Sequence, residues 1–214
     1  MFKRRCFRMK TIERNILSFQ EPKFFSPIRD KREYVRILVY SAKQLLLEDS
    51  NFDKAPIGAT MKLIIDKMSR LFFYKGAKYF SISFPFFVTT EGNDVIDITT
   101  YSGRRLDYEN ISTIISIVDS ADFVNNPSLI DISIEDESID FSDLSLLEEI
   151  FQFEPSYIRY DFDPEKENGN IHPLHHLDIN YSQYGVYKLG LNQEITRGCF
   201  ENLQNIKTDC FYLT

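Results

Sequence analysis

The residues best suited to chemistry lie in one stretch of the chain, from Tyr157 to Asn180. This stretch contains the run Arg-Tyr-Asp-Phe-Asp-Pro at 159–164 and all three histidines of the sequence, at positions 172, 175 and 176. An imidazole can move a proton near neutral pH, a carboxylate can orient that imidazole, and a guanidinium can hold a phosphate or an oxyanion. This combination is typical of phosphodiester or acyl-transfer chemistry.

Two predicted strands, Tyr157 to Phe162 and Leu174 to Tyr181, carry these groups. Side chains alternate between the two faces of a strand, so every second residue shares a face. If the two strands pair as a hairpin, one polar sheet face collects an arginine, a histidine and carboxylates within hydrogen-bonding reach. The predicted catalytic residues are Arg159, Asp161, His176 and Asp178.

In this interpretation His176 is the general acid or base, Asp178 or Asp161 orients it, and Arg159 stabilises phosphate charge. A Gly-Arg-Arg turn at 103–105 could present two further guanidiniums to an anion. The predicted substrate-binding residues are Arg104, Arg105 and His172.

Each of these features also has a purely structural interpretation. Arg159 can form cross-strand ion pairs that fix the register of the sheet, and Arg104 with Arg105 can pair with the acidic part of the chain. His175, on the apolar face of its strand, is expected to be a hydrogen-bonded core histidine. His176→Ala is therefore expected to remove activity at little cost in stability, and His175→Ala mainly to lower stability.

A metal site is a third interpretation, because His172, His176 and Asp178 are suitable ligands at close spacing. One strand supplies two ligands at most from such a spacing, and no third ligand from elsewhere can be identified. We therefore predict no metal and no cofactor.

The motifs of this stretch resemble a known signature. Residues 158–164 read Ile-Arg-Tyr-Asp-Phe-Asp-Pro, residues 172–177 read His-Pro-Leu-His-His-Leu, and the aromatic pair Phe211-Tyr212 follows a predicted helix. Together they resemble an uncharacterised prokaryotic domain-of-unknown-function family, whose members carry an Arg-aromatic-Asp-aromatic-Asp-Pro strand followed by His-Pro-x-x-His-Leu. The resemblance covers about the last quarter of the chain and implies no particular reaction. In chemistry alone, the cluster is similar to small RNA-cleaving toxins of bacterial toxin–antitoxin and defence systems.

The composition indicates a globular protein, since 43% of the 214 residues are hydrophobic and 14% are aromatic. We expect one domain over 1–214, with 1–28 as a candidate extended arm. Three unclustered cysteines favour a reducing compartment, and the protein is expected to be cytoplasmic. Phosphate-binding glycine loops, the Gly-x-Ser-x-Gly motif and His-Glu-x-x-His are absent from the sequence, which disfavours P-loop, Rossmann, α/β-hydrolase and zincin enzymes.

The net charge of −7 conceals two halves of opposite sign. Residues 1–78 carry 18 Lys and Arg against 8 Asp and Glu, whereas residues 79–214 carry 7 against 24. The region from Asp119 to Glu167 would repel a duplex. If the basic N-terminal helices pack on the acidic C-terminal half, the opposite charges of the two halves neutralise each other.

The predicted fold class is α+β, with a largely antiparallel sheet and four or five helices. Helical spacing of apolar residues covers 30–48, 56–73, 108–120, 141–153 and 194–206, although isoleucine-rich 108–120 could also be a strand. Alternation predicts strands at 79–84, 95–99, 129–134, 157–162, 174–181 and 186–191, with a turn at 91–94 joining the first two.

Two functions of different class remain. The first is a metal-independent, ribonuclease-like or other phosphodiester-acting enzyme, a toxin or defence effector with RNA as substrate. The second is a non-catalytic accessory module of a toxin–antitoxin or phage-defence system, whose acidic half binds a basic protein partner. The sequence sets no oligomeric state.

Overall fold

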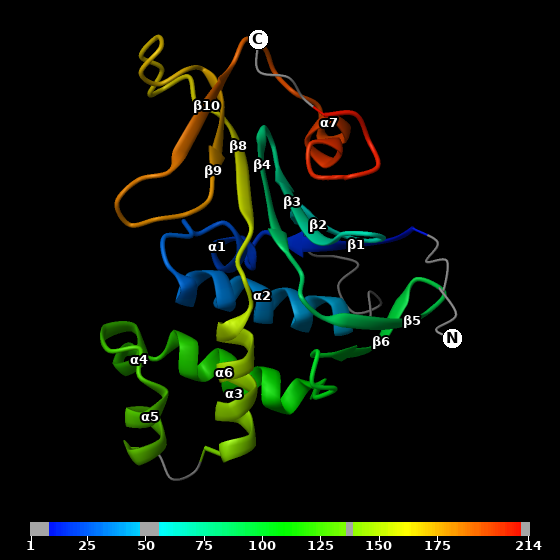
Figure 1. Ribbon diagram of the computed structural model, residues 1–214, viewed down its shortest axis with the longest axis vertical. Helices are drawn as coiled ribbons and strands as arrows, with labels where there is room; N and C mark the ends of the chain where they lie inside the picture. The colour runs from blue at the N-terminus through cyan, green and yellow to red at the C-terminus, as the bar shows by residue number, and fades with distance from the viewer. Residues whose placement is uncertain (1–8, 48–55, 136–138, 211–214) are drawn as a thin grey trace. The chain divides into compact units, whose positions relative to one another are not determined.

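The computed structural model describes residues 9–47, 56–135 and 139–210 (Figure 1). The described residues gather into two compact units: unit 1 contains the chain up to Ser18, Pro56–Phe84 and the chain from Ser156 on, and unit 2 is the two stretches between these segments. The predicted single domain over 1–214 stays a prediction. Within the candidate arm, Lys10–Leu17 is a sheet strand and Glu21–Phe24 a helix, while residues 1–8 lie outside the described residues, as does the aromatic pair Phe211-Tyr212.

The fold is α+β with antiparallel sheets, as predicted. Unit 1 contains a seven-stranded sheet in the order β1-β2-β3-β4-β8-β9-β10, followed by one short helix. These elements are β1 (Lys10–Leu17), β2 (Ile57–Ile65), β3 (Ser69–Lys75), β4 (Lys78–Ser83), β8 (Tyr157–Phe162), β9 (His175–Ile179), β10 (Tyr187–Leu191) and α7 (Arg197–Asn202).

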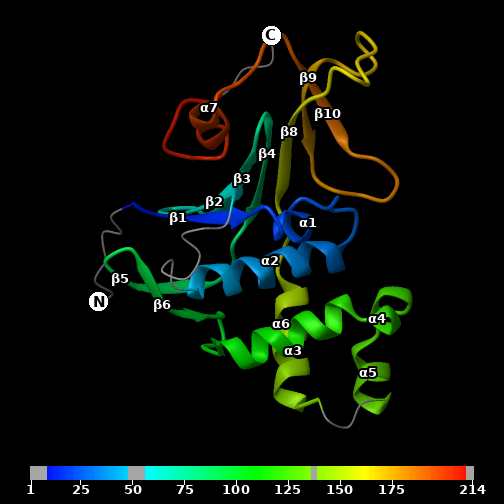
Figure 2. The same cartoon turned by 180° about the vertical axis from the view of Figure 1, so that it is seen from behind.

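Strands β4 and β8 lie side by side, although more than seventy residues separate them in the sequence (Figures 1 and 2). Tyr79 faces Tyr160 across this ladder, and the amide of Ser83 donates to the carbonyl of Ser156 at 3.1 Å. Every pair of neighbouring strands in the sheet is therefore also consecutive within unit 1.

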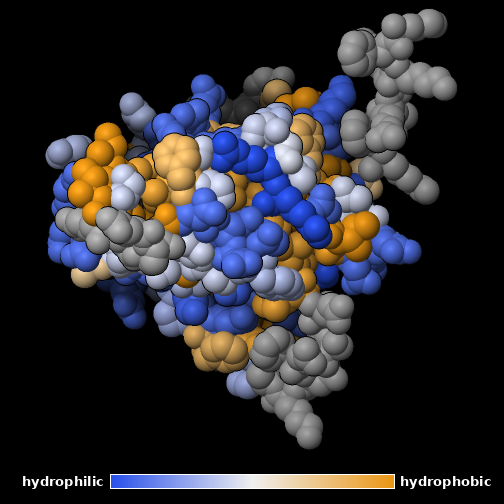
Figure 3. Space-filling model, turned by 90° about the horizontal axis from the view of Figure 1, so that it is seen from below, coloured by the Kyte–Doolittle hydropathy of each residue, from blue (hydrophilic) through white to orange (hydrophobic). Residues whose placement is uncertain are grey.

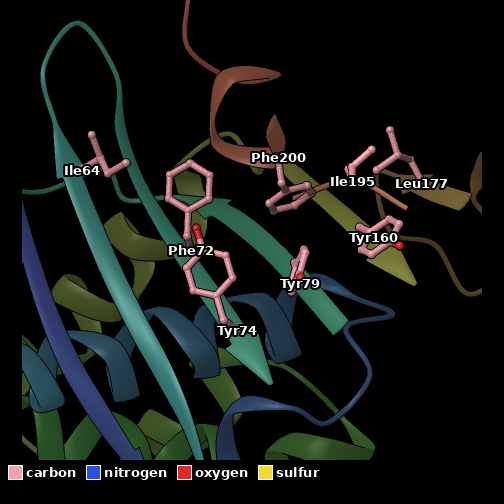
Figure 4. Close-up of a cluster of buried hydrophobic side chains, with 8 residues drawn as sticks. All are labelled: Ile64, Phe72, Tyr74, Tyr79, Tyr160, Leu177, Ile195 and Phe200. Carbon is pink, nitrogen blue, oxygen red and sulfur yellow. The ribbon is translucent and has the colours of Figure 1, made fainter. Parts of the chain in front are cut away.

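One face of the large sheet packs against α7. Phe200 of this helix is fully buried, and its ring lies 6.1 Å from Phe72 and 6.0 Å from Tyr79 (Figure 4). The helix is positioned by Thr196, whose side chain accepts from the amide of Cys199. Burial of this aromatic cluster fixes α7 on strands β2 to β4 and β8 to β9.

The opposite face of the same sheet changes character from one edge to the other. On β1 to β4 the middle of this face is mainly apolar and includes Leu63, Leu71 and Ile82. Its polar side chains are Arg14 and, toward the strand ends, Lys10, Ser69, Lys75 and Lys78. On β8 and β9 the residues in register with them are charged or polar. The candidate site thus lies at the polar end of an otherwise mainly apolar sheet face.

Unit 2 contains a three-stranded sheet and six helices in its described residues. These elements are α1 (Glu21–Phe24), α2 (Lys31–Leu46), β5 (Phe87–Glu91), β6 (Asp94–Thr99), β7 (Arg105–Leu106), α3 (Tyr108–Asp119), α4 (Ala121–Asn125), α5 (Leu129–Glu135) and α6 (Phe141–Gln152).

The basic helix α2 packs on α3, which belongs to the acidic half of the sequence. Asp30 caps α2 by accepting from the amide of Glu33 at 2.8 Å. Arg36 pairs with Asp119 at 2.6 Å, and the hydroxyl of Tyr40 donates to the same carboxylate at 2.7 Å. Arg36 of this helix is thus paired with an acidic residue of α3, while neutralisation of the basic helices by the acidic half as a whole stays a prediction.

Several predicted elements are wrong. The stretch 56–73 is not a helix but most of the β2–β3 hairpin, and 129–134 is not a strand but helix α5. The strand at 95–99 does not pair with the strand at 79–84; it pairs with β5, across the predicted turn at Gly92. The last helix is shorter than 194–206, since α7 covers only Arg197–Asn202.

The other predicted helices and strands are present with small shifts at their ends. The helix alternative for 108–120 is the one observed, and Asp107 forms a capping box with Asn110. Residues 48–55, including the predicted end of the helix at 30–48, lie outside the described residues. Over 9–47, 56–135 and 139–210, no helix combines the length and apolar character needed to cross a membrane.

Candidate functional site

The register between β8 and β9 brings the four predicted catalytic residues onto one sheet face. Arg159 faces Asp178, and Asp161 faces His176, on the neighbouring strand. One more hydrogen bond joins the two strands at the loop that connects them: the amide of Asp163 donates to the carbonyl of Leu174 at 3.0 Å. The four residues thus share one face as predicted, whereas the His176 ring is hydrogen-bonded to the carbonyl of Pro173 and not to Asp161 or Asp178, which were expected to orient it.

Arg159 joins both carboxylates of the cluster. Its Nε lies 2.7 Å from Asp161 Oδ2, in a contact that is an ion pair rather than a linear hydrogen bond, and its Nη2 donates to Asp178 Oδ2. Burial tends to lower the pKa of Arg159, but Tyr157, Asp161 and Asp178 outweigh it, and the pKa lies above its ordinary value. The cross-strand ion pairs that the sequence left as an alternative are thus present.

The carboxylates and the imidazole of the cluster are buried. The exposed fractions are 7% for Asp161, 1% for His176 and 2% for Asp178, whereas the side chain of Arg159 is 35% exposed. Asp178 Oδ1 is buried and has no hydrogen-bond partner among the described residues. Arg159 therefore forms the accessible rim of the site, and Asp178 and His176 form its floor.

The expected difference between the two neighbouring histidines needs correction. His176, expected to be an exposed catalyst, is almost fully buried, and His175 is only half-buried. His175 does lie on the apolar face and shares a hydrogen bond of 2.8 Å with the hydroxyl of Tyr160, as expected of a core histidine. Because of its burial, His176→Ala must lower stability at least as much as His175→Ala.

The ring of His176 is oriented by a backbone carbonyl. Its Nδ1 lies 3.0 Å from the oxygen of Pro173, and since a carbonyl only accepts, Nδ1 carries the proton of the neutral ring. The lone pair of the ring is then on Nε2. Such a nitrogen can take a proton or bind a cation.

His172, predicted to bind substrate, lies beside the cluster. Its ring centre is 4.7 Å from that of His176, Nδ1 accepts from Lys188 Nζ at 3.0 Å, and Nε2 is 3.4 Å from Asp163 Oδ2. Burial tends to raise the pKa of Asp163, but Lys166 and His172 outweigh it and hold the pKa below its usual value. This outer layer adds positive charge next to Arg159.

Three site residues were not predicted from the sequence. Tyr157 and Lys188 share the face of the cluster, and Gly190 faces His176 across the β9–β10 ladder. A Cβ on Gly190 would lie 3.0 Å from Cγ of Pro173, so glycine leaves room for the residue that orients His176. The alternation of 186–191, applied like that of 174–181, would have identified Lys188 and Gly190.

The hydroxyl of Tyr157 stays protonated at this site. Burial raises its pKa to about 12, and the negative charges of Asp161 and Asp178 act in the same direction against Arg159. The hydroxyl of Tyr157 is therefore uncharged over the pH range in which most enzymes work.

The two arginines of the Gly-Arg-Arg turn are not part of this cluster. They belong to unit 2, where Arg104 lies 3.8 Å from Glu149 and Arg105 lies 2.7 Å from Asp97. These contacts correspond to the ion pairs that the sequence left as an alternative. Their role in substrate binding stays a prediction.

Three residues could hold a metal ion, and they differ from the set considered in the sequence. Asp161, His176 and Asp178 each offer one ligand atom, and these atoms all lie within 4.8 Å of one another. The ligand that could not be identified from the sequence is Asp161, which the β8–β9 pairing supplies. His172 is instead engaged by Lys188 and Asp163.

The site therefore combines a buried imidazole lone pair, two carboxylates and a partly exposed guanidinium on neighbouring strands. The resemblance to a prokaryotic family of unknown function stays a prediction. Comparisons of the chain with protein-family models, with curated proteins and with solved structures found no match.

Proposed function

We propose that this protein is an enzyme that acts on the phosphodiester bonds of RNA, working in the cytoplasm as a toxin or defence effector. The observation that carries the proposal is the convergence of Arg159, Asp161, His176 and Asp178 on one sheet face. Phosphodiester cleavage needs a group that holds the phosphate and a basic atom beside it. The cluster offers both.

Arg159 is the phosphate-binding group in this proposal. Its side chain is the exposed member of the cluster, and a guanidinium suits a planar contact with two phosphate oxygens. Lys188 of β10, whose Nζ donates to Nδ1 of His172 next to the cluster, extends the cationic rim across the sheet. Nε2 of His176, which carries the lone pair of the ring, is the basic atom that the reaction needs.

His176→Gln is expected to lower the rate of RNA cleavage by about 100-fold or more, because glutamine keeps the polar contact and loses the imidazole lone pair. The measurement is cleavage of end-labelled RNA by purified protein, with growth arrest on expression as a second measurement.

The matched control is His175→Gln, which alters the neighbouring ring on the opposite face. We expect this variant to cleave within a few-fold of the wild type, with circular dichroism showing that both variants are folded. Cleavage by the His176→Gln variant at the wild-type rate would refute the enzyme proposal.

A different surface favours a second function, binding of a basic protein partner. Helix α5 and the start of α6 expose three large apolar side chains, with exposed fractions of 73% for Ile130, 71% for Ile134 and 80% for Phe141. Figure 3 shows apolar side chains gathered at the edge of the molecule where α5 lies. A pocket of about 170 Å³ between Leu129 and Leu144 adjoins them.

Acidic side chains surround this apolar surface, including the exposed Asp131 and Glu148. Burial first, and then the negative charges of Asp140, Asp107 and Glu109, raise the pKa of Asp143 in α6. An apolar surface with an acidic rim fits a basic amphipathic helix. That helix is the occupant we expect.

The double variant Ile130→Glu/Ile134→Glu is expected to bind a synthetic Lys/Leu amphipathic helix at least about 10-fold more weakly than the wild type, since it replaces apolar contacts by charge. Fluorescence anisotropy of the labelled peptide measures the affinity. Ile171→Glu, at a site 80% exposed in unit 1, is the control for the added charge. Equal weakening by both variants would contradict this second function.

A further inference from the structure

We propose that the cluster on β8 and β9 binds one divalent transition-metal ion, Mn²⁺ or Zn²⁺, through Asp161, His176 and Asp178. The inference concerns the same site as the proposed function and rests on it for the reaction served, whereas ion binding itself can be measured without any activity.

The donor set and its spacing fit such an ion. Two carboxylates and one imidazole are a mixed oxygen and nitrogen set that suits Mn²⁺ or Zn²⁺. Three ligand atoms bound at about 2.1 Å around one ion in a tetrahedral arrangement lie roughly 3.4 Å apart. The three ligand atoms here lie within 4.8 Å of one another, so side-chain rotations that bring them closer by at most about 1.4 Å would complete the set.

The charge of the cluster provides an independent argument. Asp161 and Asp178 are both buried, and Arg159 supplies the positive charge that contacts both of them. Arg159 occupies Oδ2 of each carboxylate, while Oδ1 of Asp178 is buried with no partner among the described residues. A buried polar atom of this kind is unfavourable unless a partner satisfies it. A bound cation is such a partner.

The surrounding contacts are those that orient metal ligands. The carbonyl of Pro173 accepts a hydrogen bond from Nδ1–H of His176, which leaves the lone pair of Nε2 for the ion. Arg159 holds the outer oxygens of both aspartates in the same way. Three protein ligands also leave a coordination position for water or a phosphate oxygen, as catalytic sites require.

The test is a titration of the full chain with Mn²⁺ followed by electron paramagnetic resonance, repeated with Zn²⁺ by calorimetry. The wild type is expected to bind one equivalent of ion. Asp178→Asn and Asp161→Asn are each expected to weaken binding by about 10- to 100-fold, and two variants are used in case one does not fold. Asp163→Asn, on the same face of the chain just beyond β8, is the matched control and should bind as the wild type does.

Wild-type protein that binds neither ion, or equal weakening by Asp163→Asn, would overturn the inference. RNA cleavage assays with and without a chelator separate it from the proposed function. Cleavage without ion binding refutes the metal site and keeps the enzyme, whereas ion binding without cleavage keeps the metal site and refutes the phosphodiester activity.

Discussion

Arg159→Ala is expected to lower the free energy of unfolding by about 2–4 kcal/mol. Removal of the guanidinium leaves Asp161 and Asp178 buried on adjacent strands without a counter-charge. Loss of one partner from a fully buried ion pair costs about 3–5 kcal/mol, and the lower range here allows for solvent screening of a side chain that is 35% exposed. Urea denaturation measures the change.

Two variants make this result specific. Arg159→Lys keeps the charge and should recover part of the loss, although it cannot contact both carboxylates with a planar group. Arg105→Ala removes an ion pair whose arginine is 66% exposed and should cost less than about 1 kcal/mol. If Arg159→Ala lowers the free energy of unfolding no more than Arg105→Ala does, Asp161 and Asp178 do not need Arg159 as their counter-charge.

Phe200→Ala is expected to lower the free energy of unfolding by about 3–5 kcal/mol, the usual cost of removing a buried phenylalanine. The ring is fully buried and contacts Phe72 and Tyr79, so its removal opens a cavity between α7 and the sheet. Thermal and urea unfolding give the magnitude.

Ile206→Ala is the control for this region, since Ile206 is 75% exposed and should change stability by less than about 0.5 kcal/mol. A cost below 1 kcal/mol for Phe200→Ala would show that α7 contributes little to the core of unit 1. Hydrogen exchange of the Phe200→Ala variant gives a second measurement. If the amides of α7 lose protection while those of β2 and β3 keep it, α7 again contributes little to the core of unit 1.

The candidate site could be predicted from the sequence because its strands have one polar and one apolar face. In β8, Arg159 and Asp161 alternate with residues such as Tyr160, which is fully buried against Leu177 of β9 on the α7 side. That difference fixes which residues share a face. It does not show what covers the face, and for this reason the burial of His176 could not be predicted.

The stretch 56–73 was mistaken for a helix because its end is buried on both faces, at Leu63 and Ile64 of β2 and over 71–74 of β3, although Thr60 and Lys62 do alternate with buried residues earlier in β2. Leu63 and Ile64 point to opposite faces, and each is at most 5% exposed. A strand buried on both sides has no polar alternation, and its apolar residues then also match a helical spacing. Only the pairing with β1 and β4 distinguishes the two structures.

The opposite error at 129–134 has a local cause. The alternation of isoleucine with polar residues is typical of a strand, but no strand in the described part of the chain pairs with this stretch, and of its isoleucines only Ile132 is buried. The hydroxyl of Ser128 accepts from the amide of Asp131 at 3.2 Å and starts a helix instead. Because the stretch is a helix, Ile130 and Ile134 lie on the same exposed face, and this face is the basis of the second proposed function.

The sequential order of the large sheet has a consequence for how this gene can change. The chain leaves the sheet after Ser18 and returns at Pro56, where the amide of Ser18 donates to the carbonyl of Pro56 at 2.9 Å. It leaves again after Phe84 and returns at Ser156, beside the bond between Ser83 and Ser156. Both segments of unit 2 thus begin and end at neighbouring points of an intact ladder, as inserted segments do. Recombination could lengthen, exchange or delete either segment without separating any two paired strands of the sheet that carries the site.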